Sequence, residues 1–292
     1  MNSRWQSVHV FYHDFQKLDG LVRGLVEPLF SDRLKDIPFF FVRYWEGGPH
    51  LRIRFLADHE DVRTVVDACE AYVYAAPCSK TLTAANFYLQ VMKLRTDEWM
   101  QYSWYANNTV CEIRYVAETD RYGGHEGLLI SEQLFYHSTQ LAIQSIRQAQ
   151  SLNDKIVAGI AFAYFLISQI ESLNMRRIIE FLDNQITGWQ VMLNSQVQAL
   201  KQRVTDQLAN HTDSLTAAIK TLLDDLRQSQ KTALLLLDQL CQTESLTVPY
   251  RQIVATHIHM HFNRLGVSPP YELFSLLLLR EMLSDGRLGD MS

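Results

Sequence analysis

The fold of the N-terminal part is decided by residues 39–56, which read FFFVRYWEGGPHLRIRFL. Two runs rich in β-branched and aromatic residues, 39–45 and 50–56, flank a Gly-Gly-Pro turn, and this pattern predicts a β-hairpin. Side chains alternate along a strand, so Arg52 and Arg54 share one face while the apolar residues beside them point to the other. A four-residue loop over residues 46–49 would set Arg43 opposite Arg52 and add it to the arginine face.

Further strands and helices surround this hairpin. Alternating side chains over residues 8–12 and an apolar run over 110–116 predict two more strands, and three- and four-residue apolar spacing predicts helices over 18–29 and 61–74. From about residue 126 helical spacing dominates, with helices expected over 128–149, 154–172, 175–187, 191–207 and 214–241. The expected fold class is α+β, with an antiparallel sheet and flanking helices in the N-terminal half and a largely helical C-terminal half. We expect a single domain over residues 1–292, with its α+β part at 1–125 and its helical part at 126–292.

The composition is that of a globular protein with a sizeable core. The 292 residues are 47% hydrophobic and 20% charged, which excludes a disordered or collagen-like chain. The net charge of −5 and the absence of a Lys/Arg block argue against direct binding of nucleic acid. The cysteines show no C-x-x-C spacing, the N-terminus has no apolar signal segment, and the apolar runs are too short to span a bilayer. These features predict a cytoplasmic protein without a membrane span.

The arginines of the hairpin carry the first functional prediction. Three guanidiniums on one sheet face repel one another, because no Asp or Glu alternates with them on these strands. A guanidinium is a planar fork of donors that fits a carboxylate or phosphate, so we expect a site for a small anion or an acidic side chain. Arg121 adds a fourth cation in the turn ETDRYGG (residues 118–124), just before a helix N-terminus that also favours anions. The alternative is that these arginines face solvent or pair with Asp and Glu elsewhere in the chain.

A second candidate site is the histidine-rich stretch THIHMHFNRLG at residues 256–266. On a strand its histidines would share a face and could bind a metal, but Pro249 near the start and Gly266 at the end favour a helix. On a helix only His257 and His261 share a face, and no Glu-x-x-His or Cys partner is present, so we expect no metal. One histidine acting in proton transfer is the sharper hypothesis, because imidazole titrates near neutral pH. Motifs for nucleotides, a serine nucleophile or magnesium are missing, and no cofactor is expected.

Four ordered segments carry a resemblance to a known family: residues 5–12, 42–54, 121–124 with Glu132, Phe135 and Ser138, and 259–266. Together they resemble the thiopeptide-type bacteriocin biosynthesis family, which is similar to the C-terminal glutamate-elimination domain of class I lantibiotic dehydratases. The resemblance implies a stand-alone lyase of lanthipeptide or thiopeptide (RiPP) biosynthesis that acts on a precursor peptide. A Ser or Thr of this peptide, glutamylated beforehand on its side-chain oxygen, would lose glutamate by β-elimination and become dehydroalanine or dehydrobutyrine.

The resemblance also implies roles for individual residues. The guanidiniums that would hold the glutamyl carboxylates and stabilise the departing one are those of Arg43, Arg52, Arg54 and Arg121. His259 would abstract the α-proton, and His261 is the reserve candidate, because no spacing argument separates the two. Since the chain lacks the large glutamylating domain of fused dehydratases, we expect a separate protein partner that uses glutamyl-tRNA.

Two other functions fit parts of the sequence. A related pyridine synthase joins two dehydroalanines of a thiopeptide in a formal cycloaddition, and such an enzyme has no glutamate to hold, so it does not need the arginine cluster. A non-catalytic subunit could instead bind the leader peptide by strand addition to an exposed sheet edge. The presence of all four arginines, Arg43, Arg52, Arg54 and Arg121, in this sequence favours elimination over these two functions.

Overall fold

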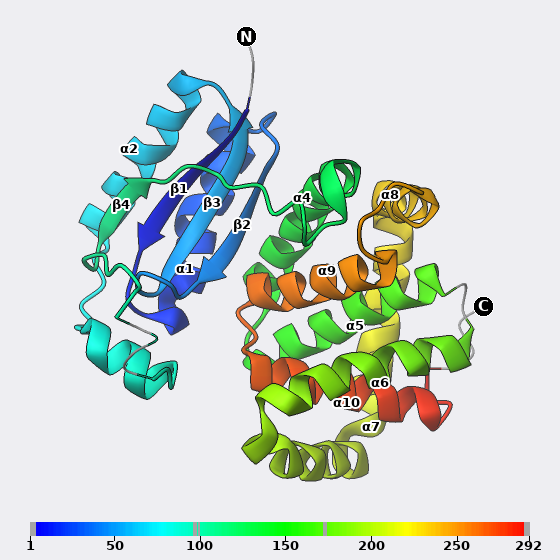
Figure 1. Ribbon diagram of the computed structural model, residues 1–292. Helices are drawn as coiled ribbons and strands as arrows, with labels where there is room; N and C mark the ends of the chain where they lie inside the picture. Colours follow the sequence, from blue (N-terminus) through cyan, green and yellow to red (C-terminus); the bar gives the residue numbers. More distant parts are fainter. Residues whose placement is uncertain (1–3, 96–97, 99, 172–173, 289–292) are drawn as a thin grey trace. The chain divides into compact units, whose positions relative to one another are not determined.

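A computed structural model describes residues 4–95, 98, 100–171 and 174–288, and the chain divides into two compact units, Met1–Val116 and Ala117–Ser292. The first is built from a sheet with helices, and the second is helical (Figure 1). The expected fold class is therefore confirmed. The expected boundary between the α+β part (1–125) and the helical part (126–292) lies inside the second unit, near the start of its first long helix.

Among the described residues of the first unit, four strands form one antiparallel sheet in the order β2-β3-β1-β4. The strands are β1 (Arg4–Phe11), β2 (Phe39–Tyr44), β3 (His50–Ala57) and β4 (Thr109–Glu112). Its described helical segments include α1 (Leu18–Leu21), α2 (His59–Ala75), a 3-10 turn (Phe15–Lys17) and π-helical turns (Val22–Val26, Leu29–Arg33, Asn86–Val91). The helix expected over residues 18–29 is thus a short α-helix continued by π turns.

One face of the sheet is buried against the helices of this unit. Leu51 and Ile53 of β3 are fully buried, and their burial, like that of the other core residues, supplies the main driving force for folding. Phe30, from the π turn Leu29–Arg33, stacks on Phe39 of β2 with 3.9 Å between ring centroids. Tyr72 of α2 donates through its hydroxyl to the carbonyl of Gly20 in α1 at 3.0 Å. Helices and sheet therefore share a single apolar layer.

The hairpin has a different register from the one expected. Its loop contains the five residues 45–49, so Arg43 pairs with Leu51, and Val42 pairs with Arg52. A shift of one residue moves a side chain to the opposite face of the sheet. Arg43 therefore lies on the buried face with Leu51, and the expected pairing of Arg43 with Arg52 is wrong. Arg52 and Arg54 share the other face, as expected.

The longer loop is fixed by contacts with distant parts of the unit. Trp45 leaves the strand and packs edge-on against Tyr88 and Tyr102, with ring centroids 6.2 and 5.3 Å apart. Gly47 donates its N–H to the hydroxyl of Tyr88 at 2.8 Å. Gly48 has a φ of 108°, and a Cβ there would lie 2.6 Å from Nε2 of His13, so only glycine fits.

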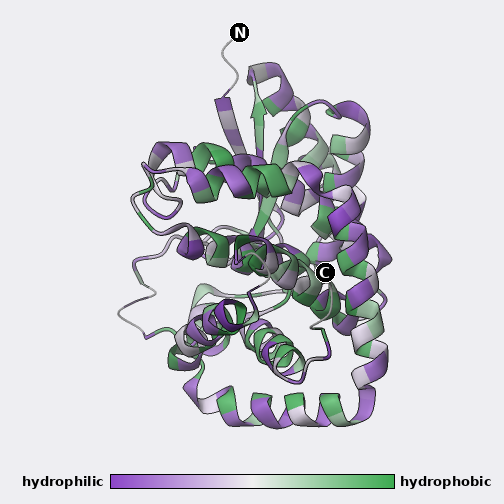
Figure 2. Ribbon diagram, turned by 90° about the vertical axis from the view of Figure 1, so that its right-hand side faces the viewer, coloured by the Kyte–Doolittle hydropathy of each residue, from purple (hydrophilic) through white to green (hydrophobic). Residues whose placement is uncertain are grey.

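The second unit is a set of packed helices (Figure 1). They are α4 (Gly124–Gln148), α5 (Leu152–Ile170), α6 (Met175–Met192), α7 (Val197–Ser229), α8 (Lys231–Gln242), α9 (Tyr250–Leu265) and α10 (Pro269–Ser284). Most carry hydrophilic and hydrophobic residues in alternation (Figure 2), as helices do that bury one side. The two helices expected over 191–207 and 214–241 are divided differently, because α7 continues through a kink at His211.

The turn between α9 and α10 has a glycine at its start and two prolines at its end. Gly266 ends α9 in the left-handed conformation, with φ at 75°, and Val267 donates its N–H back to the carbonyl of Phe262 at 3.0 Å. Pro269 and Pro270 then begin α10, where proline costs little because the first N–H groups of a helix have no partner within it. The chain therefore reverses direction and brings the first turn of α10 back beside α9.

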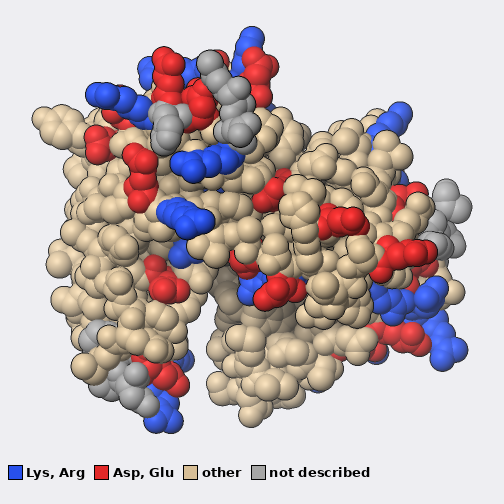
Figure 3. Space-filling view, turned by 45° about the horizontal axis from the view of Figure 1, so that its top comes forward, with Lys and Arg blue, Asp and Glu red and all other residues tan. Residues whose placement is uncertain are grey.

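The surface shows no large region of one charge on the face drawn in Figure 3, where Lys and Arg are interspersed with Asp and Glu. None of the described helices combines the length and the apolar composition needed to cross a bilayer.

Candidate active site

A cavity of about 560 Å³ opens within the helical unit. One wall is formed by α6, from Phe181 to Met192, and the facing wall by α9, as far as His259. Arg121, from the turn before α4, and Glu272, from the first turn of α10, complete the lining. The cavity thus brings together Arg121 and His259, two site residues predicted from separate segments of the sequence.

His259 and Glu272 form a hydrogen-bonded pair in this cavity. Nδ1 of His259 lies 2.8 Å from Oε2 of Glu272, and Trp189 Nε1 donates to the other carboxylate oxygen at 3.2 Å. Glu272 is almost fully buried, whereas 39% of the His259 side chain is exposed. An ionised carboxylate only accepts hydrogen bonds, so Nδ1 is the donor of this pair, and in the neutral form of the ring Nε2 then has a free lone pair. The pair therefore has the arrangement of a general base with an orienting carboxylate.

Arg121 is the cation that reaches the cavity from the turn ahead of α4. The turn is closed by the N–H of Gly124, which donates to the carbonyl of Thr119 at 2.8 Å. Arg121 pairs with Glu118 at 3.0 Å, and both side chains are substantially exposed. An exposed ion pair stabilises a protein by only about 0–1 kcal/mol. Arg121 can therefore exchange Glu118 for an anion in the cavity at little cost.

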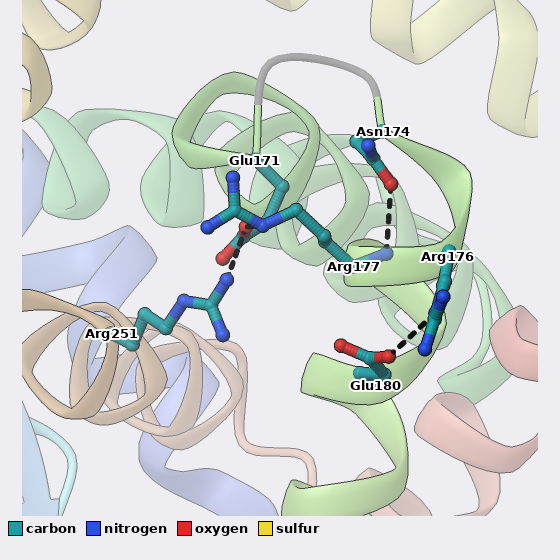
Figure 4. A network of polar contacts seen from close by, with 6 residues as sticks. All are labelled: Glu171, Asn174, Arg176, Arg177, Glu180 and Arg251. Atoms are coloured by element: carbon teal, nitrogen blue, oxygen red, sulfur yellow. Dashed lines mark hydrogen bonds and ion pairs between the residues drawn. The ribbon is translucent and has the colours of Figure 1, made fainter.

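A second cation of the cavity belongs to a network around a buried carboxylate (Figure 4). Arg251 of α9 donates through Nη2 to Oε2 of Glu171 at 2.5 Å, and Arg177 of α6 approaches the same oxygen at 3.3 Å. Glu171 is fully buried. Two guanidiniums share one carboxylate, so this network adds a net positive charge to the cavity wall.

The other two histidines of α9 face the interior. His257 and His261 are each 2% exposed, and they lie on one face of the helix, as the spacing predicts. Nε2 of His257 is 3.1 Å from Ser131 Oγ, and Nδ1 of His261 is 2.9 Å from Ser138 Oγ. Burial, reinforced by the charge of Arg264, lowers the pKa of both rings to about 3. Neither ring lines the cavity, so among the histidines of α9 it is His259 that the cavity brings near Arg121.

Arg52 and Arg54 lie on the sheet face opposite the helices of the first unit. Arg52 Nε donates to His50 Nε2 at 3.0 Å, and its guanidinium stacks over Tyr44 at 3.5 Å from the ring centroid. Arg54 lies over Tyr115 at 4.9 Å. Burial lowers the pKa of His50 to about 3 and, with the charges of its neighbours, that of His9 to about 2. This face therefore presents two guanidiniums beside neutral imidazoles.

Arg43 has a structural environment. It is 6% exposed, and its Nη2 donates to Oδ1 of Asp19 in α1 at 2.6 Å. Burial lowers the pKa of Arg43, and the carboxylate of Asp19 opposes that effect. A buried pair of this kind cannot release its arginine to a ligand without leaving a buried, uncompensated carboxylate. The prediction that Arg52, Arg54 and Arg121 meet in one pocket stays a prediction, because these residues belong to different units.

Comparisons with known proteins agree with the fold. The sequence profile of the family described as "Lantibiotic biosynthesis dehydratase C-term" matches residues 5–283. The chain belongs to this family. Membership places it among the proteins of lantibiotic biosynthesis, in agreement with the resemblance. Among curated proteins no sequence matches the chain significantly.

Three solved structures share the fold of this lantibiotic dehydratase family member. TbtD, a pyridine synthase from thiomuracin biosynthesis, is 18% identical, with a TM-score of 0.71 over 97% of this chain and 99% of TbtD. TsrL is 15% identical, with a TM-score of 0.62 over 98% and 97% of the two chains. MibB, the tRNA dependent lantibiotic dehydratase from Microbispora sp. 107891, is 16% identical, with a TM-score of 0.51 over 96% of this chain and 28% of MibB.

Sequence reasoning missed the partners of the predicted residues. Glu272, Trp189 and Arg251 were not identified, although each lines the cavity. One signal was available for Glu272: the stop at Gly266 followed by Pro269 and Pro270 indicates a helical hairpin, which returns Glu272 to the level of His259. No local signal marks Trp189 or Arg251, because their roles arise from packing between helices.

Proposed function

We propose that this protein is a lyase that eliminates glutamate from glutamylated Ser or Thr residues of a precursor peptide, leaving dehydroalanine or dehydrobutyrine. The observation that carries the proposal is the His259–Glu272 pair, in a cavity that also contains Arg121 and Arg251. A base and cations are the two elements that this reaction requires.

The chemistry assigns a task to each group. Nε2 of His259 takes the proton from Cα of the glutamylated residue, and Glu272 stabilises the imidazolium that forms. The electron pair of the Cα–H bond becomes the second bond between Cα and Cβ, and the bond from Cβ to the ester oxygen breaks. Glutamate departs with that oxygen as a carboxylate. The imidazolium then gives its proton to solvent, which restores the base.

The cations stabilise the charge on the departing fragment. Arg121 is suited to this role because its exposed pairing with Glu118 is easily exchanged. Arg251 contributes the excess positive charge of its network with Glu171. Arg52 and Arg54 of the first unit remain candidate anion-binding residues on their shared sheet face, and Arg43 is left out, since its buried pair with Asp19 accounts for its charge.

The proposed substrate requires a preceding reaction. A glutamyl group must be attached to the hydroxyl of Ser or Thr before it can be eliminated, and we assign that step to a protein partner that uses glutamyl-tRNA. The description of MibB as tRNA dependent fits such a division of labour.

Cycloaddition of two dehydroalanines is the second candidate. The observation in its favour is the extent of the likeness to TbtD, which covers nearly the whole of both chains. A pyridine synthase would leave a glutamylated peptide unchanged and would consume a peptide with two dehydroalanines.

The two candidates are separated by one assay. Wild-type protein is incubated with a synthetic peptide that carries O-glutamylserine, and in parallel with a peptide that carries two dehydroalanines, while free glutamate and peptide mass are followed. We expect release of glutamate from the first peptide and no change in the mass of the second. His259→Gln should slow this release by roughly 10²–10⁴-fold, the usual contribution of a general base, whereas His125→Gln, at an exposed position of α4, should not. Equal rates for the two variants would remove His259 from the mechanism.

A further inference from the structure

Gly188 of α6 is a glycine that neither the backbone nor the packing requires. Its φ is not positive, and a Cβ added there would meet nothing within 4 Å. Other helical glycines have evident structural reasons, since a Cβ at Gly127 would lie 2.0 Å from the carbonyl oxygen of Tyr122, and one at Gly159 would lie 2.1 Å from Phe262. Alanine is a better helix former than glycine, so glycine at position 188 costs stability without any gain in packing.

The position of Gly188 supplies a different reason. It lies on the α6 wall of the cavity, next to Trp189, which holds Glu272 and through it His259. The lining residues of α6 run from Phe181 to Met192, about 16 Å along the helix axis. An extended peptide rises about 3.3 Å per residue, so about five residues fit along this wall.

The polar groups of the walls suit a peptide main chain. Asn184 and Gln185 lie one helical turn before Gly188 on the α6 wall, and Gln252 faces the cavity from α9. Within the part of the chain that the structure describes, no hydrogen bond joins these three side-chain amides to other protein groups. A neutral amide both donates and accepts, and each residue of an extended peptide offers one N–H and one C=O. The charged groups Arg121 and Glu272 lie in the same cavity, where the reacting residue belongs.

We infer that the α6 wall is the subsite for the main chain of the substrate peptide beside the reacting residue. The missing side chain at Gly188 lets this main chain approach the helix, and the amides of Asn184, Gln185 and Gln252 pair with it. The inference rests on the proposed function in requiring a peptide substrate whose reacting residue lies at His259. It adds that the enzyme recognises the flanking main chain and not only the glutamylated residue.

The experiment compares two substrates and three variants. The long substrate is a capped Gly/Ala peptide of about nine residues with O-glutamylserine at its centre, which exceeds the length of the wall. The short substrate is N-acetyl-O-glutamylserine N-methylamide, which has no flanking residues. Gly188→Ala and Gly188→Leu narrow the subsite. Thr187→Leu places the same bulk one position around the exposed surface of α6, outside the cavity.

Replacement of Gly188 by alanine should stabilise the fold and at the same time weaken the binding of the long peptide. Gly188→Ala should raise the melting temperature by about 1–4 °C while raising KM for the long peptide. Gly188→Leu should raise KM and Kd for the long peptide about tenfold, which corresponds to about 1.4 kcal/mol, and leave the short substrate unaffected. Thr187→Leu should change neither. Binding is measured by fluorescence anisotropy of the labelled long peptide, independently of turnover.

Two results with the Gly188→Leu variant would overturn the inference. One is an unchanged KM and Kd of the long peptide in Gly188→Leu, and the other is an equal loss for long and short substrates. Turnover of both substrates in either case leaves the proposed function standing. If the wild-type protein binds the long peptide but releases no glutamate, the proposed function fails, and the anisotropy of the Gly188 and Thr187 variants still decides the inference. Failure of the wild-type protein to bind the long peptide also overturns it.

Discussion

The two buried histidines of α9 make the stability of the helical unit depend on pH. His257 and His261 are neutral in the folded protein, because burial lowers the pKa of each ring from 6.5 to about 3. In the unfolded chain the rings return to the ordinary value. As the pH falls below about 6.5, the unfolded chain therefore binds protons that the folded protein does not, and stability is lost until the folded rings also titrate near pH 3.

The size of the effect follows from these values. At pH 5 the protonation of one ring stabilises the unfolded chain by about 2 kcal/mol, and that of both rings by about 4 kcal/mol. At pH 7 the same contribution is only a few tenths of a kcal/mol. His257→Gln and His261→Asn keep a hydrogen-bonding group near the nitrogen that bonds Ser131 or Ser138 but cannot titrate. Each variant should therefore lose about 2 kcal/mol of the difference in unfolding free energy between pH 7 and pH 5.

Urea unfolding followed by far-ultraviolet circular dichroism measures this difference, because the signal comes mainly from the helices of the second unit. Exposed His125 of α4 provides the control, since His125→Gln should retain the wild-type pH dependence. The variants are also less stable at neutral pH, so only the difference between the two pH values is diagnostic. A wild-type pH dependence in both His257→Gln and His261→Asn would refute the reasoning, and would return His261 to the candidates for proton transfer.

Three further predictions follow from individual contacts. Arg43→Ala should lower the unfolding free energy by about 3–5 kcal/mol in urea titrations, because it leaves the carboxylate of Asp19 without its cation. The double variant with Asp19→Leu should recover much of this loss. Equal stability of Arg43→Ala and of Arg63→Ala, at an exposed position, would contradict a structural role for Arg43. Glu272→Gln should keep the fold by circular dichroism but slow glutamate release by about 10-fold or more, since the imidazolium of His259 loses its carboxylate; an unchanged pH–rate profile would speak against a positioning role. Gly159→Ala should destabilise the helical unit by about 1–3 kcal/mol in the same titrations, because its Cβ would overlap the ring of Phe262, and a neutral result would mean that α5 and α9 separate easily.

The sequence predicted those features that depend on periodicity. Alternation along β3 placed Arg52 and Arg54 on one face without any knowledge of neighbouring strands. The helical reading of residues 256–266 paired His257 with His261 and set His259 apart, which is the division between buried and exposed rings that the structure has. Such patterns are local, because each depends only on the repeat of the element that carries it.

The features that it did not predict depend on contacts between distant segments. Loop length in the hairpin is set by Trp45, which packs on Tyr88 and Tyr102 far along the chain, and nothing in residues 45–49 alone distinguishes four loop residues from five. A shift of the strand register by one residue then decides whether Arg43 lies on the face of Arg52 and Arg54 or in the protein interior. The pairing of Glu272 with His259 likewise requires the hairpin between α9 and α10.

The measurement that tests the central claim most directly uses a peptide whose O-glutamylserine carries deuterium at Cα. Wild-type protein is added, and free glutamate, peptide mass and deuterium content are followed together by mass spectrometry. Elimination with His259 as base predicts glutamate and dehydroalanine in equal amounts, loss of the deuterium, and a slower rate than with the undeuterated peptide. Release of glutamate with serine regenerated and its deuterium retained would show ester hydrolysis and contradict the account, as would a peptide that keeps its glutamyl group.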